Sequence, residues 1–447
     1  MAKNNYLQKA KSILEQKTPV LKRETLRDFV GHYLKSKDVY LDACKKFGSP
    51  LYLIDEPAIV RKAREFRVAF EKYLPKVKIF YALKSNYHPF LIRTLVKEGY
   101  GIDVSSGREL EMALRQKAAS MIFSGPGKTV PELELACDHH DKVIVLIDNF
   151  DELERLQRVA NRKNIKIRAG IRLMIEEKGL WRKFGIPLRL LSEFFKQAAD
   201  CRNIDLCGLQ FHASWNLDTT KQVAILRRLK KVLSTLDKKI LSKIHFVDIG
   251  GGYWPVQGEW MQPSATPEGN LKQSLDPLLT QRAGHYCLPS LGIDQFAQQI
   301  AQVIERELFP YTQCEIYLEP GRWICHEAMH ILFSVVDKKA EDVVIADAGT
   351  NTVGWERFET DYFPVINLTH PSLDEKSCMI FGSLCTPHDI WGYNYFGKTI
   401  EKDDVLMIPT QGAYTYSLRQ EFIKNLPQEV IINDSGTRIW KETPVIK

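Results

Sequence analysis

Hydrophobic and polar positions along the middle of the chain alternate between two patterns. Short apolar runs, typical of buried strands, are separated by stretches with apolar residues at helical spacing, such as Glu109–Leu114 and Phe150–Ala160. The predicted strands are Val77–Ala82, Tyr100–Val104, Ser120–Phe123, Val143–Ile147, Ile165–Leu173, Leu206–Phe211, Ile244–Ile249 and Cys314–Leu318. Eight strands separated by helices over roughly 250 residues predict a (β/α)8 barrel, with a doubly wound parallel sheet as the alternative.

The pattern changes on both sides of this region. Residues 1–47 read as charged, amphipathic helix, either a docking arm or an N-terminal cap, and Leu51–Ile54 reads as a short strand. Beyond Arg322, short β-rich runs alternate with turns, namely Ile331–Val336, Val343–Ala346, Cys378–Phe381 and Val405–Ile408. We therefore expect a helical extension over 1–47, a barrel over 48–324 and a mainly antiparallel β domain over 325–447.

The interval 253–291 fits neither pattern. It is rich in Trp, Pro, Gly and Gln and shows little periodicity. Long irregular loops in compact domains are commonly functional, and this one leaves the carboxyl end of a strand, which is the catalytic face of a barrel. We expect it to cover the substrate.

Composition narrows the class of protein. The chain has 447 residues, 44% of them hydrophobic and 26% charged, and its formal charge of +7 is interspersed, so no nucleic-acid tail is indicated. The nine cysteines are odd in number and contain no C-x-x-C pair, which argues for a reducing compartment and against a zinc site. With no signal peptide and no apolar run near ~18 residues, we expect a cytoplasmic protein without metal, nucleic-acid or membrane partners.

The first candidate for chemistry is Lys84, where the predicted strand Val77–Ala82 runs into a polar turn. Desolvation there favours the neutral amine, which can form a Schiff base, although a solvated strand-end lysine is the commoner case. Further features follow in order: His212, Asp248-Ile249-Gly250-Gly251-Gly252, Glu319-Pro320-Gly321-Arg322, Cys385 and Gly412-Ala413-Tyr414. Together they resemble the fold type III pyridoxal-phosphate decarboxylases, the family of diaminopimelate and ornithine decarboxylases, from about Ser49 to about Leu418.

The resemblance implies a fold and a cofactor. The fold is an alanine-racemase-like barrel whose first strand, about 48–56, joins the β domain, and the cofactor is pyridoxal 5′-phosphate, an electron sink for the carbanion left by loss of CO2. Lys84 corresponds to the Schiff-base lysine, Glu319 to the partner of the ring nitrogen, and His212 to the residue stacked on the ring. Around the phosphate the family places Gly250, Gly251, Gly252, Arg322 of the Glu-Pro-Gly-Arg motif with Gly321, and Tyr414. Asp103, at the end of the next strand after Lys84, is a further cofactor-side candidate.

Cys385 matches the cysteine that protonates the product carbon in this family. Read alone, it is a buried apolar cysteine, the usual fate of that residue. The family's cysteine segment reaches into the active site of a partner subunit. The resemblance therefore implies a homodimer with shared active sites.

Two departures from the family pattern bear on the substrate. Trp215 stands where relatives have a small phosphate-contacting serine, so the phosphate pocket must differ locally. Thr386 stands where basic-substrate enzymes have an acid for the distal ammonium, with His388 and Asp389 close behind as further substrate candidates. The Leu384–Asp389 and Gly125–Thr129 segments are similar to the branch that builds carboxylate-type siderophores.

We therefore expect decarboxylation of an L-amino acid or amino-acid conjugate. The alternatives are a diaminopimelate decarboxylase, an amino-acid racemase and a catalytically inactive regulatory homologue. Retention of the cysteine motif favours decarboxylation over racemisation, and retention of Lys84 and the phosphate ligands argues against an inactive homologue. A phosphate-binding P-loop at Gly127-Lys128-Thr129 is excluded, because Ile122 stands where that motif needs a glycine.

Overall fold

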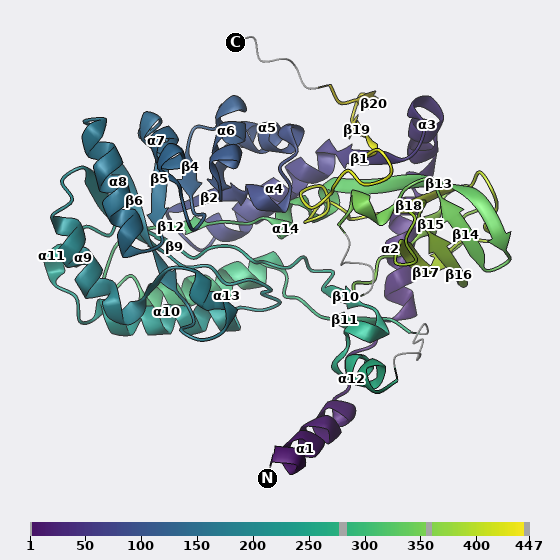
Figure 1. Cartoon of the computed structure of the whole chain (residues 1–447), viewed down its shortest axis with the longest axis horizontal. Coiled ribbons are helices and arrows are strands. Elements are labelled where there is room, and N and C mark those ends of the chain that lie inside the picture. The colour runs from purple at the N-terminus through teal and green to yellow at the C-terminus, as the bar shows by residue number, and fades with distance from the viewer. Residues whose placement is uncertain (1, 277–283, 355–359, 442–447) are drawn as a thin grey trace. The chain divides into compact units, whose positions relative to one another are not determined.

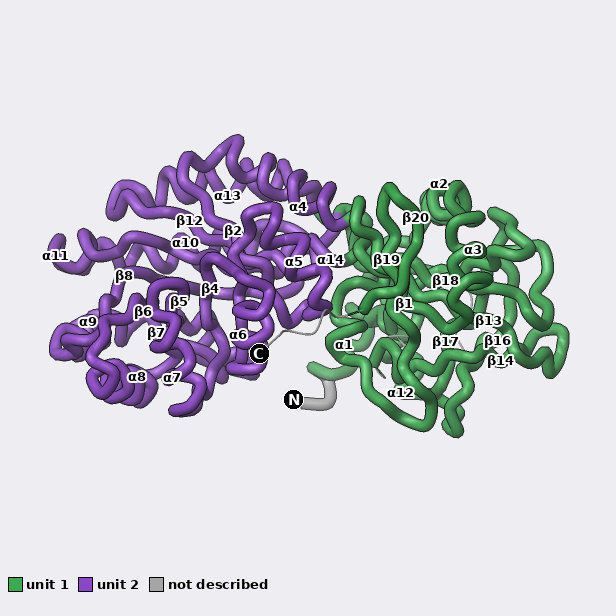
Figure 2. Tube along the Cα trace, turned by 90° about the horizontal axis from the view of Figure 1, so that it is seen from above, with its two compact units in different colours: residues 1–58, 256–290, 326–441 green, residues 59–255, 291–325, 442–447 purple. Residues whose placement is uncertain are grey.

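The computed structural model describes residues 2–276, 284–354 and 360–441, with the side chains of residues 2–4 left aside (Figure 1). The chain forms two compact units, each discontinuous in sequence (Figure 2). We call residues 59–255 with 291–325 the barrel unit, and residues 1–58, 256–290 and 326–441 the β unit. Within the described residues, no helix combines the length and apolar content needed to cross a bilayer.

The barrel unit contains a closed ring of eight parallel strands, which confirms the predicted (β/α)8 barrel over the doubly wound sheet. The strands are β2 (Val77–Ala82), β3 (Gly101–Val104), β4 (Met121–Phe123), β5 (Val143–Ile147), β6 (Ile167–Met174), β8 (Ile204–Gln210), β9 (Phe246–Asp248) and β12 (Glu315–Leu318). Pairing of β5 with β6 closes the ring, and β7 (Ile186–Pro187) adds a short edge to β6. The main helices of this unit are α4 (Glu56–Glu71), α5 (Pro89–Lys97), α6 (Gly107–Arg115), α7 (Val130–Asp138), α8 (Phe150–Arg162), α9 (Leu191–Ala199), α10 (Thr220–Leu233) and α13 (Ile293–Glu307).

Aromatic side chains fill the barrel interior. Phe246 and Tyr317 stack with ring centroids 4.5 Å apart, and Phe80 packs beside Tyr317. Gly208 makes room for this layer, since a Cβ at that position would lie 2.2 Å from the Phe246 ring. The barrel is therefore a packed core rather than a pore, and chemistry is confined to its ends.

The β unit is built on a mainly antiparallel sheet. Its strands are β1 (Leu51–Asp55), β13 (Met329–Ala340), β14 (Val343–Ala346), β15 (Ile366–Asn367), β16 (Glu375–Phe381), β17 (Ile390–Phe396), β18 (Val405–Ile408), β19 (Gln428–Asn433) and β20 (Gly436–Ile439). The long strand β13 pairs with β14 as well as β18, which closes six of the strands into a small barrel. The strand β1, which precedes α4, lies between β13 and β19.

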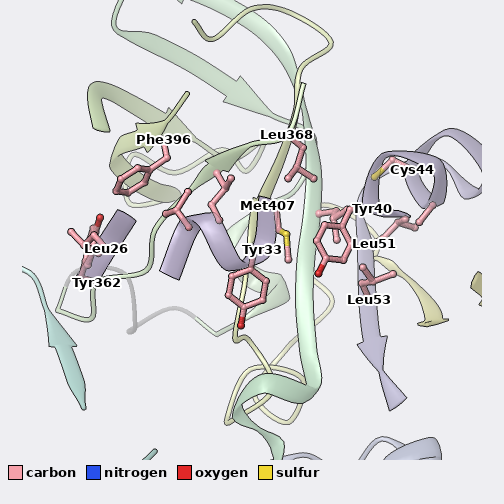
Figure 3. Packing of buried hydrophobic residues seen from close by; sticks show 14 of the residues in the cluster. Leu26, Tyr33, Tyr40, Cys44, Leu51, Leu53, Tyr362, Leu368, Phe396 and Met407 are labelled. Carbon is pink, nitrogen blue, oxygen red and sulfur yellow. The ribbon is translucent and has the colours of Figure 1, made fainter. Parts of the chain in front are cut away.

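The N-terminal helices α1 (Ala2–Glu15), α2 (Arg23–Leu34) and α3 (Lys37–Phe47) belong to the β unit. Leu26, Tyr33 and Tyr40 of α2 and α3 join a buried cluster with Leu51 of β1 and Met407 of β18 (Figure 3). The second and third helices therefore cover the sheet as a cap, one of the two interpretations that the sequence left open.

The interval 253–291 contains more regular structure than its sequence predicts. Its strands β10 (Glu259–Met261) and β11 (Tyr286–Leu288) pair antiparallel, and α12 (Pro267–Leu275) lies between them. The expectation of an irregular loop was wrong because three-residue strands are too short to show periodicity. Most of the interval belongs to the β unit, and residues 277–283 lie outside the described residues.

Candidate active site

Lys84 lies at the carboxyl end of β2, in the short 3-10 turn Leu83–Ser85. Its Nζ is 3.4 Å from Oδ2 of Asp103, which ends the neighbouring strand β3. About a third of the Lys84 side chain is exposed, whereas that of Asp103 is fully buried and accepts a 2.5 Å hydrogen bond from Ser124 Oγ. Burial, and then the negative charge of Glu319, raises the pKa of Asp103, although Lys84 acts against this. The site thus offers a reachable amine above a buried acid.

Glu319 follows β12 and is also buried. Its Oε1 accepts a hydrogen bond from Gln210 Nε2 at 3.2 Å, and its Oε2 lies 3.3 Å from Nδ1 of His212. Burial alone would raise the pKa of Glu319, but the hydrogen bond from His212 and the charge of Lys84 lower it below the usual range. Burial lowers the pKa of His212. The pair therefore consists of an ionised carboxylate and a neutral imidazole.

The glycine triplet after β9 packs closely against three other backbone segments. A Cβ at Gly250 would lie 2.6 Å from Phe211 O, one at Gly251 2.0 Å from Glu319 O, and one at Gly252 2.2 Å from Ala213 O. Gly250 and Gly252 also have φ values of +69° and +81°, which favour glycine. Only glycines fit here, so the turn brings bare backbone to the carboxyl ends of the strands.

Two of the triplet's amides contact side chains of the site. Gly250 N donates to Asp248 Oδ1 at 2.8 Å, and Gly251 N lies 3.2 Å from His212 Nδ1. Gly321 serves a related purpose, because a Cβ there would lie 2.9 Å from Ser85 Oγ in the Lys84 turn. Small residues thus hold the segments carrying Lys84 and Glu319 close together.

Arg322 begins the short helix α14 (Arg322–Cys325) and lies against two indole rings. Its guanidinium carbon is 4.3 Å from the centroid of Trp254 and 5.9 Å from that of Trp215. Trp215 is 56% exposed and has a φ of +57°, a strained conformation for a bulky residue. The residue that departs from the family's serine therefore contacts the predicted phosphate arginine.

The remaining candidates belong to the β unit. Cys385, Thr386 and His388 lie on the loop between β16 and β17, and Cys385 and His388 are exposed. All nine cysteines are described, and Cys385 is the exposed one, so the buried apolar interpretation of it was wrong. Tyr414 is half-buried with a φ of +59°, on the segment between β18 and β19.

Asp389 lies on the same loop but is buried. Its carboxylate accepts hydrogen bonds from Thr350 N at 2.7 Å, Thr350 Oγ1 at 3.0 Å and Leu384 N at 2.7 Å. A Cβ on Gly382 would collide with it at 2.2 Å. This arrangement organises the loop and disfavours the expected contact of Asp389 with substrate.

Several residues of the site were not singled out from the sequence. Ser124 and Gln210 hold the carboxylates of Asp103 and Glu319. Asn216 Nδ2 ties Ala213 O to Gly251 O, at 2.9 and 3.0 Å. These polar residues follow or end strands, as site residues do, but no spacing distinguishes them from ordinary strand-end residues.

Comparisons with known proteins agree with this geometry. A family model described as "Pyridoxal-dependent decarboxylase, pyridoxal binding domain" matches residues 57–326. The chain is 26% identical to diaminopimelate decarboxylase of Methanothermobacter thermautotrophicus, covering 92% of this chain and 93% of that one, and 26% identical to that of Neisseria meningitidis serogroup A, covering 91% and 95%.

Solved structures show the same fold. Diaminopimelate decarboxylase from M. jannaschii in complex with L-lysine superposes with a TM-score of 0.74 at 22% identity, covering 90% of this chain and 91% of that one. Lysine/ornithine decarboxylase from Vibrio vulnificus in complex with putrescine gives a TM-score of 0.70 at 23% identity, covering 89% and 98%.

The residues of the barrel unit suit pyridoxal phosphate. A reachable lysine matches its aldehyde, and the buried ionised Glu319 matches a protonated ring nitrogen. Backbone at Gly250–Gly252, where any Cβ would collide, and the guanidinium of Arg322 match its phosphate. The family model matches more than half of the length of the chain. The chain therefore belongs to the pyridoxal-dependent decarboxylase family and is a pyridoxal-phosphate-dependent amino-acid decarboxylase.

Proposed function

We propose that the enzyme decarboxylates an L-amino acid or conjugate whose far end is carboxylated or amide-linked. The observation that supports this proposal is that the loop after Cys385, which the structure describes in full, offers no available carboxylate for an ammonium group. Thr386 offers a hydroxyl, and the Asp389 carboxylate is buried and already accepts three hydrogen bonds. Holding a distal ammonium in a closed pocket takes a carboxylate, because a buried unpaired charge costs several kcal/mol or more. The exposed His388 is better suited to an anionic tail.

A second candidate substrate is meso-diaminopimelate. The relatives named above as diaminopimelate decarboxylases are similar along nine-tenths of the chain. The far end of diaminopimelate carries both an ammonium and a carboxylate. It therefore shares the carboxylate that our first candidate requires.

Steady-state kinetics separate these substrates. We expect poor CO2 release from ornithine, lysine and arginine, and better release from diaminopimelate or from a carboxylated conjugate such as citryl-diaminopropionate. A kcat/KM on ornithine or lysine of about 10⁴ M⁻¹s⁻¹ or above would contradict the proposed role of Thr386.

The barrel residues take the roles that their geometry suits. The cofactor, when bound, accepts the electron pair left by loss of CO2. Lys84 would hold it covalently, Glu319 would keep its ring nitrogen protonated, and His212 would pack on its ring. Gly250–Gly252, Arg322 and Tyr414 would bind its phosphate, and Asp103 would orient Lys84.

Cys385 would donate the proton that the product carbon needs. A thiol is a competent general acid near neutral pH, and Cys385 is the exposed cysteine of the chain. We expect Cys385→Ala to leave a folded protein that loses product fidelity, with decarboxylation-dependent transamination as the side reaction. A variant with unchanged turnover and product would show that Cys385 is only structural.

We also propose a homodimer in which the Cys385 loop completes the partner's site. Mixing Lys84→Ala protein, which cannot hold the cofactor covalently, with Cys385→Ala protein should then restore formation of the normal decarboxylation product. Half of the sites in a mixed dimer combine a native Lys84 with a native Cys385. No recovery after verified subunit exchange would show that each chain forms its own site. A reducing, cytoplasmic location fits the nine free thiols of the chain.

A further inference from the structure

Asp248 is a third buried acid beside Asp103 and Glu319, and nothing in the proposed function uses it. The three residues lie at or next to the carboxyl ends of the strands β9, β3 and β12 of one barrel, and each is at most 1% exposed. The other polar side chains around them include those of Lys84, Glu109, Ser124, Gln210, His212 and Tyr253. Of these groups only Lys84 is a cation, since His212 is neutral.

This arrangement is short of positive charge. Three ionised carboxylates against one ammonium would leave two uncompensated negative charges on buried side chains. Each such charge costs several kcal/mol, and buried carboxyl pairs avoid this by keeping a proton.

The hydrogen bonds of Asp248 indicate where that proton lies. Its Oδ1 accepts a hydrogen bond from the amide of Gly250 at 2.8 Å, whereas its buried Oδ2 has no donor among the residues that the structure describes. Asp248 pairs with Tyr317 of the neighbouring strand β12, two residues before Glu319. Burial apart, the interaction between the two carboxyl groups raises the pKa of Asp248 and lowers that of Glu319. Two ionised carboxylates cannot bond, so Oδ2 gains a partner only if a proton lies between the two groups.

The two acids have unequal environments. Burial, and then repulsion from Glu319, raises the pKa of Asp248 well above its ordinary value. Glu319 has Gln210 and His212 as additional partners, which favour its ionised form. Asp248 is therefore the member that keeps the proton.

We propose that Asp248 carries a proton shared with Glu319 and is a positioning residue, which aims the ionised Glu319 and anchors the glycine triplet through Gly250. The Asp248 side chain then connects the two ends of the cofactor site. One end is the Glu319 carboxylate, proposed to bind the ring nitrogen, and the other is the backbone of the glycine triplet, proposed to bind the phosphate. The link to the cofactor rests on the proposed roles of Glu319 and Gly250, whereas the shared proton does not.

The proton can be detected without cofactor. In the infrared difference spectrum between the apo wild type and D248N at neutral pH, we expect the C=O band of a protonated carboxylic acid to disappear with the substitution. D294N is the control, since Asp294 is an exposed acid paired with Lys72 at 2.9 Å and its substitution should leave this band in place. A spectrum of D248N that retains the full band would overturn the proposal.

Cofactor affinity tests the positioning role. An asparagine can still accept from Gly250 N and donate to Glu319, so D248N should bind pyridoxal phosphate within about threefold of wild type. D248A loses both contacts, and its Kd should rise roughly tenfold or more, as loss of a hydrogen bond to a charged group implies.

An ionised Asp248 predicts the opposite pattern. D248N would then lack the negative charge of Asp248 and bind pyridoxal phosphate as weakly as D248A does. That result would overturn the proposal. It can be read from D248N alone, by a Kd outside the threefold range, even if D248A proves too unstable to assay. Failure of wild-type protein to take up pyridoxal phosphate on Lys84 would instead refute the proposed function, and the infrared result on apoprotein would still stand.

Discussion

The Nζ atom of Lys84 lies 3.4 Å from the buried carboxyl group of Asp103. The two residues end neighbouring strands, and Ser124 on the next strand end fixes the other carboxyl oxygen. Asp103 and Ser124 therefore position the amine of Lys84, while about a third of the Lys84 side chain stays exposed. Such an amine is placed to react with a carbonyl that enters from solvent.

Asp389→Ala should lower stability more than it changes substrate binding. The variant leaves the amides of Thr350 and Leu384 without their acceptor, and losses of this kind cost on the order of 2 to 3 kcal/mol. Denaturant unfolding measures the loss, and the exposed neighbour substitution His388→Ala, as control, should stay within about 0.5 kcal/mol of wild type. A rise in KM at unchanged stability would instead place Asp389 in the substrate pocket.

Arg322→Lys should weaken cofactor binding although it conserves charge. The guanidinium stacks on Trp254, 4.3 Å from its centroid, and a lysine lacks both the planar face and the fork that binds phosphate. We expect the Kd for pyridoxal phosphate to rise roughly tenfold. Quenching of indole fluorescence measures the binding of pyridoxal phosphate, and the substitution Arg189→Lys at an exposed position is the control. Equal affinities of the two variants would show that Arg322 does not bind the phosphate.

His330 makes the β unit sensitive to acid. It is 1% exposed on β13, its Nδ1 accepts from Thr410 N at 3.1 Å, and its ring packs edge-on against Tyr33. Burial lowers its pKa from 6.5 to about 4, although Asp55 and Glu327 act against this.

The sign of the pH effect follows from this lowered pKa. Below pH 6.5 the unfolded chain binds a proton that the folded chain excludes until about pH 4, so stability falls across this window as the pH drops. The loss attributable to His330 is on the order of 2 to 3 kcal/mol. His330→Asn should flatten the pH dependence of the free energy of unfolding, whereas the control His388→Gln, at an exposed position, should not. Parallel plots of unfolding free energy against pH for wild type and His330→Asn would contradict this prediction.

Much of the fold was predictable because buried parallel strands are continuous apolar runs. The prediction for β2 and β5 matched at both ends, and the other six barrel strands were placed to within two residues at either end. The missed elements carry no such signal. The strands β10 and β11 pair across an intervening helix, and β20 is a short, mostly exposed strand in a tight hairpin with β19. The strand β17 (Ile390–Phe396) mixes polar and aromatic residues.

The site was predictable where chemistry demands a residue type, and less so where residues support one another. Lys84, His212, the glycine triplet and Glu319 come together at the carboxyl ends of the barrel strands. Asp248 was visible only as the residue two positions before the triplet, because its closeness to Glu319 arises from strand register. The engagement of Asp389 with Thr350 likewise depends on tertiary contacts between distant segments.

The central claim is that Lys84 holds the cofactor, and borohydride reduction of cofactor-saturated protein followed by peptide mapping tests it most directly. We predict a pyridoxyl group on the peptide that contains Lys84, and none in Lys84→Ala. Lys128 provides an internal control, since it is buried and paired with Glu152 at 2.8 Å and should stay unlabelled. A pyridoxyl group on any other lysine in place of Lys84, or no labelling of the saturated wild type, would contradict the account.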